Sequence, residues 1–321
     1  MTAAPRELAA TERRLLRLRH ELDDDGIWLP ADDGLLSLLL VELDYARHPH
    51  AHEGIAPRYG ALLATADEAG SRTFEQLELV DISTIPLTTA RRLADGRSSF
   101  VARVVGGRDR LVCFERTREY ESSAVHLAGA TGALVVQRLG QGWVRLATSQ
   151  GVAIWDGIHW STRPLSSALV ERVAPELPGG DPDVLASVLE LCTHWLAAGR
   201  VGATLVWRTD GDPHSLDGLG MQASVPIPPL DLRKRAHFAA LLNALSQYDR
   251  ATLVDAAGAV RTVGVHLRSS ERSRREIPPY RGTRHTSALR FSHDCDSAIV
   301  FVVSSNGTLS VFCRGERLAA D

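Results

Sequence analysis

The order of secondary-structure elements expected in the C-terminal half most strongly constrains the fold of this chain. Apolar spacing predicts helices at 183–198 and 230–246, and short apolar runs between and after them predict strands. A third helix is expected to begin at Thr286 and to lead into strands at 298–303 and 308–313. Because helices alternate with strands here, we expect an α/β (α+β) fold, with a C-terminal mixed β-sheet flanked by helices.

A break in composition divides the chain. Residues 173–183 contain three prolines and two glycines, a pattern typical of a linker or a domain seam. We therefore expect a C-terminal domain at 182–315 and an N-terminal α+β accessory or sensor domain at 1–175. This division agrees with the length of 321 residues, which suits about two domains.

The N-terminal half shows fewer clear signals. Leucines spaced along one face predict a helix at 6–22, and apolar runs separated by glycine turns predict several strands between residues 100 and 161. Residues 54–90 give no firm prediction. The pattern is that of an α+β domain, and it carries no motif that identifies a function.

Composition excludes several classes of protein. The net charge of −3 makes nucleic acid an unexpected partner. The longest apolar stretches are too short to span a membrane, and the N-terminus lacks the pattern of a signal peptide. We therefore expect a cytoplasmic protein with no membrane partner. The four cysteines have no CxxC spacing, which argues against a disulfide framework and a cysteine zinc site.

The segment from Arg281 to Ser310 is the most specific in the chain. It reads Arg-Gly-Thr-Arg-His-Thr-Ser, then a helical stretch, an apolar strand and a return strand. An arginine at a helix start offers a planar fork of donors to phosphate oxygens, and the free N–H groups of the helix start also attract anions. Hydroxyl groups of Thr283, Thr286 and Ser287 add further donors. By itself, this pattern also fits a capped surface helix with a solvated arginine.

This segment resembles the diadenylate cyclase domain of DNA-integrity-scanning proteins. The family pattern runs G-T-R-H-R-A-A, S-x-x-x-D-A, an apolar strand and V-S-x-x-x-G-x-I-S. The chain matches it with Gly282-Thr-Arg-His285, Ala288, Ser292, Asp296, Ser304, Gly307 and Leu309-Ser310. A second family motif, D-G-A, is matched upstream by Asp249-Arg250-Ala251. The resemblance covers residues 182–315, and we identify the domain as a divergent member of that family.

The resemblance implies a reaction and a site. Two ATP molecules would condense to cyclic di-AMP with loss of two pyrophosphates, with Mg²⁺ or Mn²⁺ as cofactor and with two protomers facing each other. Partners would then be ATP and further copies of the chain, in a homodimer or a higher homo-oligomer. Asp249 would be the catalytic carboxylate and the metal ligand. The nucleotide-binding positions would be Arg250, Ala251, Gly282, Thr283, Arg284, His285, Thr286 and Ser304, although the family serine can also be aligned on Val303.

Two departures from the family pattern keep a second function open. Arg250 stands where the family has the glycine of D-G-A, and Thr286 replaces the second arginine of R-H-R. A catalytically degenerate nucleotide-binding sensor would tolerate both changes. Residues 268–284 are expected to form a long Arg/Ser loop, and its arginines could replace the lost charge or simply be solvated: Arg268, Arg272, Arg274, Arg275 and Arg281.

Two weaker patterns lie in the N-terminal half. Histidines 48, 50 and 52 alternate as in a metal site, but a surface loop is the better interpretation because no second ligand cluster is evident. Residues 122–136 align without gaps on residues 286–300, and both read as a helix that leads into a strand. The N-terminal half is therefore a possible degenerate repeat of the C-terminal domain, although any helix–strand unit can produce such a match.

Overall fold

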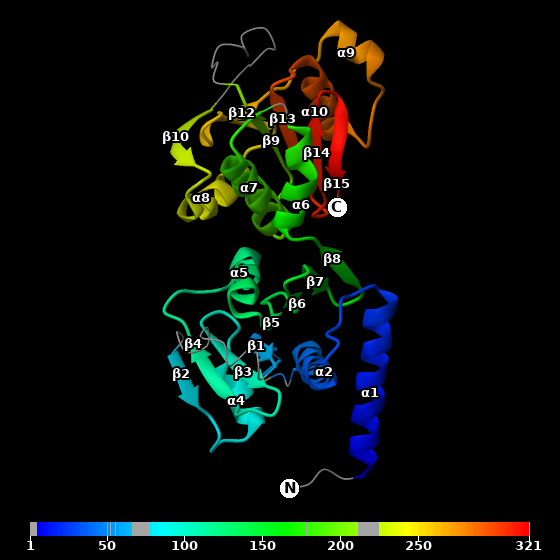
Figure 1. Cartoon of the computed structure of the whole chain (residues 1–321), viewed down its shortest axis with the longest axis vertical. Coiled ribbons are helices and arrows are strands. Elements are labelled where there is room, and N and C mark those ends of the chain that lie inside the picture. Colours follow the sequence, from blue (N-terminus) through cyan, green and yellow to red (C-terminus); the bar gives the residue numbers. More distant parts are fainter. Residues whose placement is uncertain are drawn as a thin grey trace. The chain divides into compact units, whose positions relative to one another are not determined.

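The chain forms two compact units, residues 1–165 and 166–321 (Figure 1). This computed structural model describes residues 5–49, 51, 53–54, 56–65, 78–177, 179–210 and 225–320. His50 and His52 of the alternating histidines lie outside these residues, as does most of the loop predicted at 209–220. The seam predicted at 173–183 lies within the second unit, where helix α6 (Ser166–Val173) contacts helix α7 (Pro182–Leu191).

The first unit is built on a mixed sheet of eight strands in the order β2-β4-β3-β1-β5-β6-β7-β8. β1 and β3 are parallel, and the other neighbours are antiparallel. The bounds are β1 Tyr59–Ala64, β2 Glu78–Asp81, β3 Ser99–Val104, β4 Arg110–Cys113, β5 Leu134–Arg138, β6 Val144–Ala147, β7 Val152–Trp155 and β8 Trp160–Arg163. The strands predicted between residues 100 and 161 are thereby confirmed to within a few residues.

Helices cover both faces of this first sheet. One face packs against α1 (Pro5–Asp24), α2 (Asp33–Arg47) and α4 (Leu87–Leu93), and the other packs against α5 (Glu121–Thr131). β1 is consequently buried at every position, as expected for a central strand that is covered on both sides. The helix predicted at 6–22 is confirmed as α1. The region 54–90, which gave no firm prediction, holds β1, β2 and α4.

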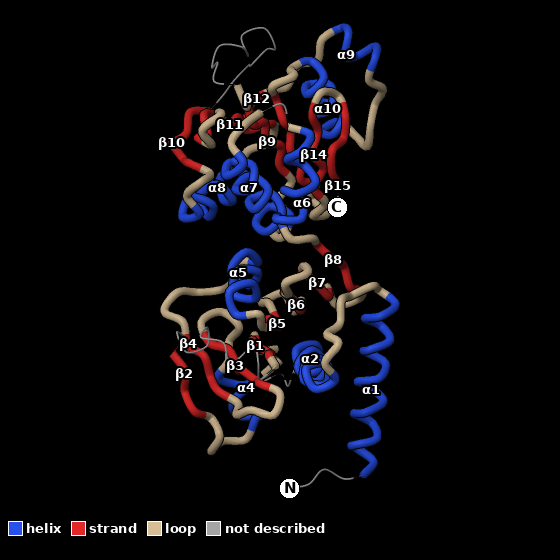
Figure 2. The backbone as a smooth tube through the Cα atoms, in the orientation of Figure 1, coloured by secondary structure: helices blue, strands red, loops and turns tan. Residues whose placement is uncertain are grey.

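The second unit repeats this layered design with a mixed sheet of seven strands, ordered β10-β12-β11-β9-β13-β14-β15 (Figure 2). Its strands are β9 Ala203–Arg208, β10 Val225–Asp231, β11 Ala251–Val254, β12 Ala259–Val265, β13 Ala298–Val303, β14 Leu309–Cys313 and β15 Glu316–Ala320. α6, α7, the π-helical turn Cys192–Ala197 and α8 (Phe238–Leu245) cover one face, and α10 (Thr283–Asp294) covers the other. The predicted mixed sheet flanked by helices is therefore observed.

The helix predicted at 230–246 is wrong over its first half. Residues 225–231 form β10, and the helix proper begins only at Phe238. Pro226, Pro228 and Pro229 lack the N–H needed for a central strand, but β10 lies at the sheet edge and pairs only with β12. These prolines therefore belong to an edge strand.

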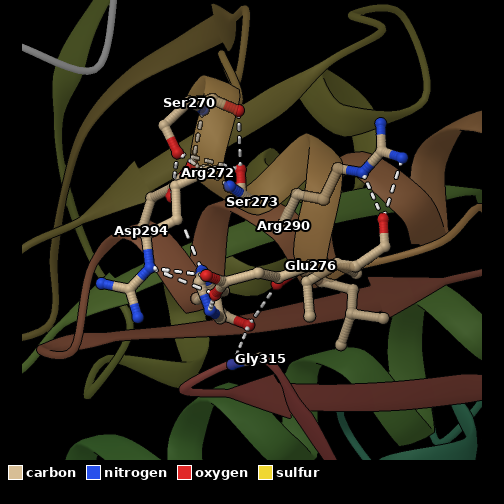
Figure 3. Close-up of polar contacts among 11 residues, drawn as sticks. Ser270, Arg272, Ser273, Glu276, Arg290, Asp294 and Gly315 are labelled. Carbon is tan, nitrogen blue, oxygen red and sulfur yellow. Dashed lines mark hydrogen bonds and ion pairs between the residues drawn. The ribbon is translucent and has the colours of Figure 1, made fainter.

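The long loop predicted at 268–284 contains the short helix α9 (Glu271–Glu276), which is fixed to the end of α10 (Figure 3). The Asp294 carboxylate accepts hydrogen bonds from Ser270 N (2.8 Å), Ser270 Oγ (2.6 Å) and Ser273 Oγ (2.7 Å). The Arg290 guanidinium donates to the Ile277 carbonyl at 2.9 Å. The segment that precedes the Arg-His motif is therefore anchored by specific hydrogen bonds.

Candidate nucleotide site

A cavity of about 310 Å³ lies where β9 and β11 begin and β12 ends, next to the start of α10. Because β9 and β11 are parallel, their first residues lie at the same edge of the sheet. The lining of the cavity combines one carboxylate, two arginines, one histidine, hydroxyl groups and apolar side chains: Thr204, Asp249, Arg250, Ala251, Val265, His266, Leu267, Thr283, Arg284 and Ser287. Charged and hydroxyl groups that converge beside apolar side chains are typical of a small-molecule site.

An ion pair links the two sequence motifs across this cavity. Arg284, in the first turn of α10, places Nη2 at 3.2 Å from Oδ1 of Asp249, which lies two residues before Ala251 at the start of β11. Asp249 is 84% exposed, and the backbone N–H of Arg250 and the Arg284 guanidinium lower the pKa of its carboxyl group. Asp249 is therefore ionised at neutral pH and remains open to a ligand.

Gly202 makes room for the Arg284 guanidinium. A methyl group added at Gly202 would lie 2.5 Å from Arg284 Nη1, and the backbone nitrogen of Ser305 is close by, at 3.4 Å from that methyl. The absence of a side chain at this position lets the guanidinium lie against the backbone at the start of β9. The sequence analysis did not single out Gly202 as a site residue, since glycines beside strands are common and this one belongs to neither motif.

Arg250 adopts a backbone conformation that favours glycine. Its φ is +76°, in the left-handed region where a Cβ atom meets the backbone and where glycine is the usual residue. The departure from D-G-A has therefore changed the side chain without removing the backbone conformation that a glycine would adopt. Arg250 lines the cavity and adds a positive charge there.

His285 lies in an aromatic cluster and is absent from the cavity lining. Its ring packs edge-on against Tyr280 and Phe312, with centroids 6.2 Å and 6.1 Å away. Burial lowers the pKa of His285 below its usual value of 6.5, and the charges of Arg281 and Arg284 lower it further. The imidazole is thus neutral at pH 7, so in this structure it positions the start of α10 and carries no charge for a phosphate.

The structure places most of the remaining predicted residues outside the cavity lining. The Thr286 hydroxyl donates to the carbonyl oxygens of Tyr280 and Gly282, at 3.0 Å and 2.9 Å, and accepts from Tyr280 N, so it fixes the turn before α10. Gly282, with φ of +111°, is the exposed residue that caps this helix. Ser304 begins the turn after β13, where its N–H donates to the Thr308 carbonyl. Ala251 and Thr283 line the cavity.

Four cavity residues were not predicted to belong to the site: Thr204, Val265, His266 and Leu267, which strand pairing brings there. Ser287, named with Thr283 as a hydroxyl donor at the start of this helix, also lines the cavity. The arginines of α9 do not join them: Arg272 pairs with Glu276, and Arg274 pairs with Glu271 on the same helix. Arg250 and Arg284 are consequently the two arginines that line the cavity.

The residues around the cavity fit a divalent ion that arrives with its substrate. Within the described ranges, no group of three or more His, Cys, Asp or Glu side chains is placed to hold a metal ion. Mg²⁺ commonly binds through one or two carboxylates together with substrate phosphates and water. Asp249, exposed and ionised beside two arginines, offers such a single carboxylate.

Two family profiles match the chain. Residues 191–317 match the family described as "DisA bacterial checkpoint controller nucleotide-binding", and residues 16–164 match "Probable sensor domain DACNK". A search of curated proteins gives no match. None of the described helices is long and apolar enough to cross a membrane.

Solved structures share low identity with the chain. One is that of a hypothetical membrane spanning protein from Bacillus cereus, with 20% identity and a TM-score of 0.32, covering 44% of this chain and 72% of the other. Another is a double cysteine mutant of DacA from Staphylococcus aureus, with 20% identity and a TM-score of 0.31, covering 42% and 86%. At these TM-scores neither likeness supports a conclusion about this chain.

The conformation of Arg250 leads to a prediction about stability. Arg250→Gly should leave the free energy of unfolding unchanged or raise it by up to about 1 kcal/mol, because glycine adopts φ of +76° without strain. Arg250→Val should lower it, since a β-branched residue is strained there. Urea denaturation of the three proteins measures both changes. A clear loss of stability in Arg250→Gly would show that the arginine side chain stabilises this turn.

The buried His285 predicts a pH dependence. Because its pKa is lower in the folded than in the unfolded chain, its contribution to stability is present above pH 6.5 and is lost as the pH falls through its folded pKa. The free energy of unfolding should fall between pH 7 and pH 5.5, and by less in His285→Phe, which keeps an aromatic ring and does not titrate. An NMR titration of the His285 ring with a midpoint at or above 6.5 would contradict this account.

Proposed function

Residues 191–317 belong to the diadenylate cyclase domain family, and on that premise we propose that this chain condenses two ATP molecules to cyclic di-AMP. The single observation that carries the proposal is the pairing of Asp249 with Arg284 at the edge of the cavity. A carboxylate and a guanidinium held together are the charges that a metal–triphosphate substrate needs.

The reaction joins each ribose to the other nucleotide. The 3′-hydroxyl oxygen of one ATP attacks the α-phosphorus of the second, a new P–O bond forms, and the bond to pyrophosphate breaks. The hydroxyl proton leaves to a base or to water, and the same exchange in the opposite direction closes the ring. The products are cyclic di-AMP and two pyrophosphates, and the reaction consumes no other reactant.

The side chains divide this work by their charge and position. Arg284 and the N–H groups at the start of α10 would hold phosphate oxygens, and Thr283 would add a hydroxyl donor. Asp249 would hold Mg²⁺ or Mn²⁺, which supplies neutralisation of phosphate charge when bound. A carboxyl group whose pKa is lowered is a poor proton acceptor, so the metal-ligand role suits Asp249 better than that of a general base.

A second candidate function is nucleotide binding without turnover. It is favoured by Arg250, which lines the cavity, and by Thr286, whose hydroxyl is used in the turn before α10. In that case the long arginine obstructs the nucleotide, or one positive charge is missing from the triphosphate site. We further propose that residues 16–164 act as a sensor, on the basis of the profile they match.

The proposed reaction predicts a product and a residue on which it depends. Purified chain incubated with ATP and Mg²⁺ or Mn²⁺ should yield cyclic di-AMP by mass spectrometry. Asp249→Asn should lower the rate by about 100-fold or more, because a bound metal ion supplies several kcal/mol of charge stabilisation in the transition state. Asp183→Asn, which makes the same change at an exposed position of α7 outside the cavity lining and both motifs, is the control. ATP that binds but stays unchanged would favour the second function.

Self-association should control the rate, because a product made from two nucleotides is most simply formed between two copies of the site. The rate per chain should rise with protein concentration until the oligomer is fully formed. Sedimentation and activity measured over the same dilution series test this. A monomer with a constant rate per chain would contradict the expected homodimer.

A further inference from the structure

The two units share one arrangement of strands, although they match different family profiles. Each has a central parallel pair, β1 with β3 or β9 with β11. On one side of this pair lie two further strands, β4 and β2 in the first unit and β12 and β10 in the second. On the other side lie β5-β6-β7 in the first unit and β13-β14-β15 in the second. The order along the chain also agrees, apart from the additional helix α9 before α10: after two strands come a helix, two strands, the helix α5 or α10, and three strands.

The pairing registers extend this match to single residues. Val135 lies on the sheet face that α5 covers, and Val300 lies on the face that α10 covers. Val135 pairs with Leu62, and Val300 pairs with Val206. Leu62 pairs in turn with Ala102, and Val206 pairs with Leu253. Counting two residues back from these pairs, Gly60 takes the position of Thr204, and Phe100 takes the position of Ala251. The gapless alignment of residues 122–136 with 286–300 matches Val136 with Val300, so it differs by one residue from this structural match of β5 with β13.

The next strand gives one more equivalent residue of the cavity wall. Phe100 pairs with Val112, and Ala251 pairs with Val265. Two residues beyond, Phe114 takes the position of Leu267. Three residues that line the nucleotide cavity, Thr204, Ala251 and Leu267, are therefore replaced in the first unit by a glycine and two phenylalanines, whereas Val265 corresponds to a valine.

These phenylalanines fill the equivalent space. Phe100 is fully buried, and its ring packs edge-on against Phe114 with centroids 5.7 Å apart. A methyl group at Gly60 would lie 2.5 Å from the Cα atom of Gly96 and 2.6 Å from the Phe100 ring, so a threonine at this position would collide with both. The glycine is thus required by the neighbouring backbone as well as by the ring, and the equivalences place the ring where the second unit has its cavity.

The Asp249–Arg284 pair is not repeated at the equivalent positions of the first unit, where the preceding residues Arg97 and Glu119 form an ion pair at 2.8 Å instead. Ser98, two residues before Phe100, takes the position of Asp249. On the helix, Ala124 and Leu127 face the sheet as Ala288 and Phe291 do, which places Tyr120 at the position of Arg284. The positions equivalent to both members of the Asp249–Arg284 ion pair therefore carry no charge.

We infer that residues 59–155 are a closed copy of the nucleotide-binding fold, in which Phe100 and Phe114 occupy the ligand space. The chain then binds one nucleotide, in the second unit, and a reaction that joins two nucleotides needs a second copy of the chain. The inference that the cleft is closed is based on contacts within the first unit. The inference that each chain binds one nucleotide rests on the proposed function.

Binding stoichiometry tests the count. The full chain is titrated with a non-hydrolysable ATP analogue and Mg²⁺ by calorimetry, and one analogue per chain is expected. Arg284→Glu, which opposes the phosphates and suits a helix N-terminus, should bind none. Two analogues per chain, or one retained in Arg284→Glu, would overturn the inference. No binding to the parent chain would refute the proposed function and leave the closed cleft to the next experiment.

Indole tests the closed cleft without any nucleotide. Phe100→Ala should open a ring-sized apolar cavity, and saturating indole should raise the Tm of this variant by about 2 °C or more through binding to the folded state. Leu127→Ala removes a buried side chain of the same core outside the equivalent site and should respond less. Phe100→Leu serves if the alanine variant does not fold. If indole raised the Tm of the Phe100 variant and of Leu127→Ala equally, the inference that Phe100 fills the ligand space would be wrong.

Discussion

The parallel pairing of β9 with β11 is the constraint on which the candidate site depends. Parallel neighbours need a crossover connection, and here it contains β10 and α8 before the chain returns at Asp249. β13 runs antiparallel to β9, so its far end and the start of α10 reach the same sheet edge. Residues far apart in the sequence meet there because strand direction and register leave them no other position.

Two neighbouring residues at the start of α10, Arg284 and His285, differ in charge and in environment. Arg284 faces the cavity and pairs with an exposed carboxylate, whereas the adjacent His285 is buried between aromatic rings and stays neutral. The first turn of α10 therefore uses one side chain to carry charge and the next to fix the helix. This division explains how a helix start can present an arginine to solvent and still be held firmly by the core.

The sequence predicted what depends on local pattern and on motif order. β13 is a continuous apolar run and β9 is a largely apolar one, and the two motifs led directly to the cavity that holds Asp249 and Arg284. It did not predict β10, because prolines are compatible with an edge strand as well as with a helix start, and only the sheet order decides between them. It also missed α9, whose six residues depend on Asp294 in a distant part of the sequence. His266 and Thr204 reach the cavity through register alone, which no local signal encodes.

The left-handed backbone at Arg250 has a genetic consequence. The codons GGN for glycine and CGN for arginine differ only in their first base. Since the turn already holds φ at +76°, a single base change would exchange the arginine for glycine without requiring the main chain to rearrange. A domain built this way can gain or lose a cationic side chain at its ligand cavity in one mutational step, while the strand that follows keeps its register.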